Sequence, residues 1–317
     1  MSRLRACLVC SALVLGAAAQ EAPRLAAPTE NVTVTVIKDG EAAVGKFVEG
    51  MTVPTRVTGK VARWKNGICP IVVGLPPEAA KLLVQRIRAL AAEVGAPVNP
   101  REPCPGNIEV IFTAQPQALL DNIRIMHPVL LGYYDNSAQA EKLATSTRPI
   151  QSWYSTATVD ARGNPIVDGG RKGGVHLSIA LPPAGMGGPP GPPDILEMYM
   201  PDAAVTNVTG GRLGDGVSSA LNNVMIVADT GKLLGRDAGN VGDYIAMLAL
   251  AQIQPPDACQ ALPSILNLLA PGCSGDTLTS ADTAYLRALY KITTTTTLAG
   301  QRREIQYQMY QALTAKQ

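Results

Sequence analysis

The chain has 317 residues, of which 46% are hydrophobic and 16% charged, so it is long enough to bury a substantial core. It carries 27 basic and 25 acidic residues, which gives a formal net charge of +2. Two of the basic residues, Arg3 and Arg5, stand at the extreme N-terminus, and without them 25 basic residues face 25 acidic ones. This balance gives no electrostatic support to a nucleic-acid partner.

Residues 1–19 have the pattern of a secretory signal peptide. Arg3 and Arg5 form a basic start, residues 6–16 are apolar, and three alanines at 17–19 suit a signal peptidase. Because the apolar run is shorter than a membrane span, we expect cleavage before Gln20 and no integral membrane segment afterwards. An uncleaved membrane anchor is the alternative. The Ala-, Gly- and Pro-rich composition favours a bacterial protein that is periplasmic or secreted.

Four cysteines follow the predicted signal peptide, namely Cys69, Cys104, Cys259 and Cys273. An even number of cysteines in an exported chain indicates two disulfide bonds. We predict the pairs Cys69–Cys104 and Cys259–Cys273, because each pair closes a short loop within one structural unit. A four-cysteine metal site is the alternative, and these four cysteines lack the CxxC spacing that is typical of such sites.

The first part of the chain alternates predicted strands and helices after a loose segment at residues 20–30. Strand patterns occur at residues 31–37, 44–48, 57–64 and 68–75. Pro76 and Pro77 open a predicted helix that ends at Val94, because Gly95 follows it. The next predicted elements are a strand at 107–112, helices at 116–125 and 137–144, and a strand at 148–160.

The second part begins with a predicted strand at residues 175–181. A Pro/Gly-rich stretch at 182–193 follows, which we interpret as a loop or as a Pro-rich binding segment. The last predicted elements are a strand at 222–229 and helices at 239–253, 280–290 and 298–314. This order predicts one α+β domain over residues 31–317, with a mixed or antiparallel sheet, packed helices and a helical C-terminal part at 239–317.

Aromatic residues make up 4% of the chain, and two groups of them stand out. Tyr133 and Tyr134 form one pair, and Trp153 and Tyr154 form the other. Each pair could line a groove or contribute to the core. At the helix predicted for residues 239–253, Asn240 is the expected N-cap.

Two segments near the C-terminus resemble the end of a metzincin-type zincin metallopeptidase domain. Residues 264–268 read Ser-Ile-Leu-Asn-Leu, and residues 278–290 read Leu-Thr-Ser-Ala-Asp-Thr-Ala-Tyr-Leu-Arg-Ala-Leu-Tyr. The resemblance implies a zincin-like fold, in which the helix at 239–253 takes the place of the zinc-binding helix. The chain is also similar to uncharacterised exported bacterial proteins. Ordinary helix capping and core packing could also explain these residues without common ancestry with zincins. Thr279 or Ser280 can cap a helix whose leucines face a core.

The helix at 239–253 lacks the residues that bind zinc in that class of peptidase. A zinc-binding helix carries two His one turn apart, with a Glu between them as the general base. Asp243, Tyr244 and Met247 occupy these positions here. We therefore expect neither a catalytic metal nor another cofactor. We interpret the chain as a pseudoenzyme with a binding or structural role in the cell envelope, and another envelope protein is its candidate partner.

The alternative function is hydrolysis at a site without zinc. The chain has two histidines, His127 and His176, and either could act as a general base for a serine or a carboxylate. His127 precedes Pro128 at a predicted helix end, whereas His176 lies in the strand predicted at 175–181. The chain has no Gly-x-Ser-x-Gly motif to accompany them.

Overall fold

The structure is a computed structural model that describes residues 40–160, 164–168, 175–180, 195–200, 216–255, 257–273, 275, 277–293 and 297–315. Within 175–180 and 195–200 it describes the backbone and, of the side chains, those of Ser178 and Ile195. The predicted signal peptide, the segment at 20–30, the strand at 31–37 and the Pro/Gly-rich stretch at 182–193 lie outside the described residues.

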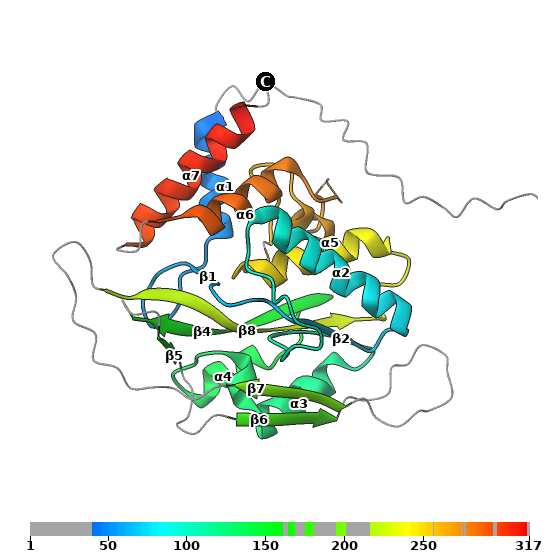
Figure 1. Cartoon of the computed structure of the whole chain (residues 1–317). Helices are drawn as coiled ribbons and strands as arrows, with labels where there is room; N and C mark the ends of the chain where they lie inside the picture. Colours follow the sequence, from blue (N-terminus) through cyan, green and yellow to red (C-terminus); the bar gives the residue numbers. More distant parts are fainter. Residues whose placement is uncertain are drawn as a thin grey trace, which may run out of the picture. The chain divides into compact units, whose positions relative to one another are not determined.

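A six-stranded mixed sheet forms the centre of the described chain (Figure 1). Its strands are β1 (Ala62–Trp64), β2 (Pro70–Val73), β3 (Ile108–Thr113), β4 (Ile150–Val159), β5 (Pro165–Val167) and β8 (Ser218–Asp229). The order is β2-β3-β8-β4-β5, with β1 beside β8. Strands β1, β2, β3 and β8 are parallel, whereas β4 is antiparallel to β8 and β5 is antiparallel to β4. The sequence prediction of an α+β protein with a mixed sheet is therefore confirmed.

Strand β8 is the central strand because it pairs along both of its edges. On one edge β1 pairs with its first part, where Ala62 lies opposite Ser219, and β3 pairs with its last part, where Ile108 lies opposite Val224. Strand β4 occupies the whole of the other edge. A strand that is covered on both faces needs a continuous apolar sequence, and residues 224–228 are all buried.

Helices cover both faces of this sheet (Figure 1). One face carries α1 (Gly40–Met51), α2 (Pro77–Val94), α5 (Ala238–Leu250), the short η2 (Ile265–Leu269), α6 (Ser280–Lys291) and α7 (Leu298–Thr314). The other face carries α3 (Pro116–Met126), η1 (Pro128–Leu131) and α4 (Ser137–Leu143). Each face buries its own cluster of hydrophobic side chains, and the larger cluster lies on the α5 side.

A second, two-stranded sheet consists of β6 (Val175–Ala180) and β7 (Ile195–Met200). The strands are antiparallel, and His176 pairs with Tyr199. Strand β6 lies where the sequence predicts it. Strand β7 is not predicted, because it follows a Pro/Gly-rich stretch whose composition masks the short apolar run.

Of the strands predicted near the N-terminus, the one at 44–48 is wrong and the one at 57–64 is too long. Residues 44–48 belong to helix α1, whose buried residues recur at the spacing of one helix face, at Val44, Phe47, Val48 and Met51. In the segment 57–64, a strand forms over Ala62–Trp64 alone, because a turn at Gly59 with φ +66° occupies the first part. A short apolar run does not distinguish strand from helix until its partners are known.

Both predicted disulfide bonds are present. Cys69 is bonded to Cys104 and Cys259 to Cys273, with Cα atoms 6.0 and 5.3 Å apart. Disulfide bonds are typical of proteins from oxidising compartments. No helix in the described part of the chain combines the length and the apolar character that a membrane span requires.

Candidate functional site

Helix α5 lies where the resemblance to zincins places the metal-binding helix. Its N-cap is Asp237, whose side chain accepts a hydrogen bond from the backbone N–H of Asn240 at 2.9 Å. The prediction of Asn240 as the N-cap is therefore wrong by three positions. The helix ends at Leu250 and not at residue 253, because Ala251 already has an extended backbone.

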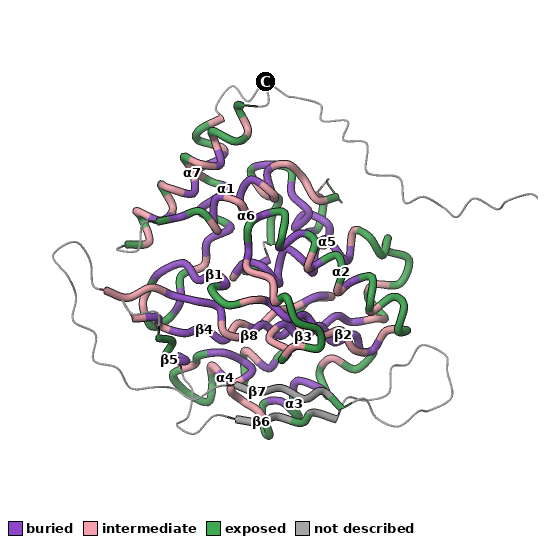
Figure 2. The backbone as a smooth tube through the Cα atoms, in the orientation of Figure 1, coloured by how far each residue is buried: buried purple, intermediate pink, exposed green. Residues whose placement is uncertain are grey.

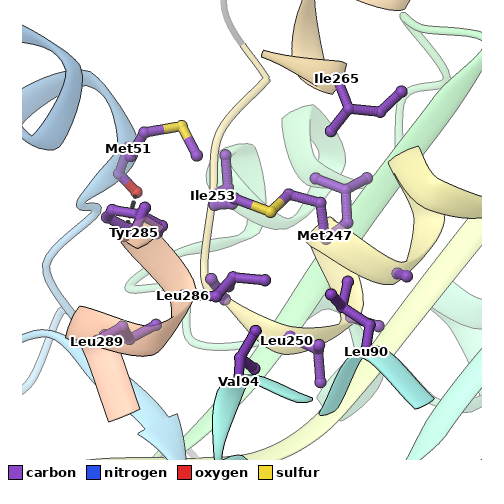
Figure 3. Packing of buried hydrophobic residues seen from close by; sticks show 14 of the residues in the cluster. Met51, Leu90, Val94, Met247, Leu250, Ile253, Ile265, Tyr285, Leu286 and Leu289 are labelled. Atoms are coloured by element: carbon purple, nitrogen blue, oxygen red, sulfur yellow. Dashed lines mark hydrogen bonds between the residues drawn. The ribbon is translucent and has the colours of Figure 1, made fainter. Parts of the chain in front are cut away.

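The positions that correspond to the two zinc-binding His, Asp243 and Met247, and to the general-base Glu, Tyr244, are all buried. Asp243 forms a two-pronged ion pair with Arg86 of α2, and this hydrogen bond raises the pKa of Arg86. Burial raises the pKa of Tyr244, which is 1% exposed. Met247 is fully buried, and Figure 3 shows it among the core side chains that surround Ile253. Asp243 thus connects α5 to α2, whereas Tyr244 and Met247 belong to the interior.

The C-terminal end of α5 is held by three aromatic side chains from other elements. Helix ends carry carbonyl groups without partners inside the helix, and burying them unpaired is costly. Here the carbonyls of residues 248, 249 and 250 accept hydrogen bonds from Tyr154 at 3.0 Å, Trp64 at 2.8 Å and Tyr290 at 2.6 Å. Burial raises the pKa of Tyr154 to about 12, so its hydroxyl stays protonated and remains a donor.

The aromatic pairs have separate structural roles. Trp153 points to the opposite face from Tyr154 and donates to the carbonyl of Leu143 at the end of α4, at 2.8 Å. Tyr133 lies at the surface, with 36% of its area exposed. Trp153 and Tyr154 therefore do not line one groove, and the core interpretation holds for Trp153, which is buried.

The two segments that resemble peptidase motifs are joined by one buried carboxylate. Asp282 accepts hydrogen bonds from Ser264 Oγ at 2.6 Å, from the N–H of Ile265 at 2.8 Å, and from the N–H and hydroxyl of Thr279 at 3.0 Å each. Thr279 also caps α6, as predicted. These hydrogen bonds to Asp282 fix the turn at η2 against the start of α6, which is a structural role.

The structure places the two histidines on neighbouring elements. His127 lies between α3 and η1, where burial lowers its pKa and a hydrogen bond with the main chain of Ser178 raises it. His176 lies two residues before Ser178 in β6, and its side chain is outside the described residues. The partner of His127 is thus a main-chain group.

Glu109 of β3 is a buried ionisable residue that the sequence analysis does not identify. It is fully buried, and its Oε1 accepts a hydrogen bond from Asn223 at 2.9 Å. Its Oε2 has no hydrogen-bond partner in the part of the chain that is described. Burial raises the pKa of Glu109 from 4.5 to about 8, against the opposing effect of the bonds from Asn223 and the backbone. The signal in the sequence is an acidic residue inside an otherwise apolar strand.

The described residues form open hollows around the helices of the larger core, including three of about 340 to 500 Å³. One of about 360 Å³ lies between α6 and α7, and one of about 500 Å³ lies between α1 and α7. The third, of about 340 Å³, lies between the end of α1 and the segment that follows α5. None of them is lined by Asp243, Tyr244 or Met247. These three hollows are therefore lined by other residues than the three positions of α5 that the zincin resemblance singles out.

Among the residues that the structure describes, no three His, Cys, Asp or Glu side chains converge in a way that could hold a metal ion. Comparisons of the chain with protein-family models, with curated proteins and with solved structures find no match.

Proposed function

We propose that the protein is an exported, non-catalytic protein of the bacterial cell envelope, with a zincin-like arrangement and a binding or structural role in the periplasm or outside the cell. One observation carries the proposal: residues 241–250 of α5 are all buried. A catalytic helix must present ligands to a cleft that substrate can enter. Helix α5 instead uses its side chains for packing and for the ion pair with Arg86.

The order of elements supports the zincin-like part of the proposal. Strand β2, the long helix α2 and strand β3 form an early strand–helix–strand unit. Strands β4 and β8 follow, with β4 antiparallel in an otherwise mostly parallel sheet, and β8 leads into α5. The two disulfide bonds support export to an oxidising compartment.

Metal analysis of the purified, dialysed protein tests this function. We expect zinc well below one equivalent per chain and no zinc-dependent cleavage of a casein substrate, with a zinc peptidase assayed in parallel as the positive control. One tightly held equivalent of zinc, or cleavage that a chelator abolishes, would overturn the proposal. A variant with Asp243→Ala then shows whether any bound metal uses this helix.

A further inference from the structure

The groove between α6 and α7 is lined in part by small side chains. Ala284 and Ala288 of α6 and Ala312 of α7 line it, and their short side chains leave a hollow of about 360 Å³. Tyr307 stands at its wall with 66% of its surface exposed. An exposed aromatic side chain beside an apolar hollow is typical of binding surfaces, where Tyr is enriched.

The charged groups that line this groove are cations. Arg287 and Lys291 lie one turn apart on α6, so both project along the same side of the helix. Among the described residues the lining contains no Asp or Glu. Arg287 also bonds to Glu93 of α2 at 2.7 Å, and both side chains of this pair are partly exposed. The groove therefore favours an occupant with acidic groups at its rim.

The walls of the groove decide the form of the occupant. Both walls are helices, whose backbone N–H and C=O groups are bonded within each helix, so an added strand would find no ladder to join. A helix satisfies its own backbone and can place a row of apolar side chains over a small-residue floor. An amphipathic helix with acidic flanks meets both the shape and the charge of the site.

The neighbouring groove between α1 and α7 is less suited to the same occupant. Its lining includes the acidic Glu49 beside Arg302 and Arg303. Arg302 already donates to the hydroxyl and the carbonyl of Thr52, at 2.7 and 2.9 Å. Arg302, one of the two cations of this groove, thus holds α7 on the end of α1, and Glu49 would repel the carboxylates of an acidic occupant.

We infer that the groove between α6 and α7 binds an acidic amphipathic helix of a partner protein. This inference rests on the proposed binding role and adds the surface and the class of partner. Apolar side chains of the partner fill the hollow over the three alanines, its carboxylates meet Arg287 and Lys291, and Tyr307 packs along its side.

Titration of the whole protein with a fluorescent synthetic helix tests the inference. The probe carries Leu along one face with Glu on either side, and matched peptides replace Glu by Lys or place a helix-breaking Pro at the centre. We expect saturable binding of the Glu peptide that weakens with added salt, and about tenfold weaker binding by each of Lys291→Glu and Tyr307→Ala. Lys142→Glu on α4 makes the same charge change at an exposed site and should bind like the unmodified protein.

Three outcomes would overturn this assignment. The first is Glu-peptide binding that neither groove variant changes. The second is equal binding of the Glu and Lys peptides. The third is Lys291-dependent binding to phosphatidylglycerol vesicles with no binding of the peptide. None of these affects the zinc measurement, so the groove can fail while the non-catalytic function stands. Circular dichroism of each variant separates lost binding from lost folding.

Discussion

Helix α5 buries every residue from 241 to 250, whereas α7 buries three, Gln301, Ile305 and Met309. The carbonyls at the end of α5 are taken up by aromatic donors from three other elements. Helix α7 has a groove on each flank, and Figure 2 shows exposed and half-buried residues along it. Sequence resemblance and availability for binding are thus separate properties of a helix in this protein. The helix that resembles a catalytic element is committed to the interior, and the helix without a motif borders open surface.

The largest expected difference between the two helices is in core packing. Met247→Ala should lower the free energy of unfolding by about 2–5 kcal/mol, because it leaves a cavity in the larger cluster. Tyr307→Ala, which removes an exposed side chain of α7, should change it by less than about 0.5 kcal/mol. Urea unfolding of both variants measures the difference. Equal losses would break the distinction between an interior and a surface helix.

Glu109 extends the comparison to the interior of the sheet. Burial raises the pKa of Glu109 to about 8, so the folded protein holds this proton more tightly than the unfolded chain does. Stability is then greatest below the unfolded pKa near 4.5 and is lost as the pH rises through about 8. At about 1.4 kcal/mol per unit of pKa shift, we expect a loss of several kcal/mol across this window that is absent in Glu109→Gln.

The free energy of unfolding, measured at pH 5, pH 6.5 and pH 8 at steps of about 1.5 units, gives the dependence of stability on pH. The exposed Glu78 of α2 offers the matched control, and Glu78→Gln should keep the pH dependence of the unmodified protein. If Glu109→Gln and the unmodified protein lost stability in parallel as the pH rises, another group would be responsible.

The aromatic donors at the end of α5 give the next effect. Tyr290→Phe keeps the ring and removes the hydroxyl that bonds to the carbonyl of residue 250 at 2.6 Å. A buried carbonyl then lacks its donor, which should cost about 1–3 kcal/mol. Tyr307→Phe makes the same change on α7 and should be close to neutral. Equal melting temperatures of the two variants would argue against the role of Tyr290 as a cap.

The smallest effect concerns the ion pair of Asp243. Asp243→Asn keeps the shape of the side chain and removes the charge that faces Arg86. Since the Arg86 side chain is 46% exposed, water can solvate it in the variant, and we expect a loss of about 1 kcal/mol. A double-mutant cycle with Arg86→Gln measures the coupling. A coupling near zero would mean that Asp243 does not tie α5 to α2.

The sequence correctly predicts the elements whose ends are marked by residues close by in the chain. Helix α2 begins at its prolines and ends before Gly95, which has φ +81°, and α6 is capped by Thr279 as its sequence indicates. Both disulfide pairings follow from loop length. Helix α1 is missed as a helix because its apolar run is short, and the packing of α7 against it lies far away in the sequence.

The candidate sites depend on contacts that no local pattern records. The donor from Trp64 reaches the carbonyl of Ala249 across 185 positions of the chain, so the capping of α5 is invisible in the sequence. The burial of Glu109 depends on strands that pair from both sides. The hollow between α6 and α7 follows from the way the two helices pack and from where their alanines meet, which the pattern of either helix alone does not fix.

Native-state hydrogen exchange tests the commitment of α5 to the interior most directly. The amides of residues 244–250 should exchange only by global unfolding, with a free energy equal to that from urea unfolding. The amides in the second half of α7 should exchange faster, through local opening. Exchange of the α5 amides by local opening, at rates equal to or above those of α7, would contradict the account of α5 as a structural helix.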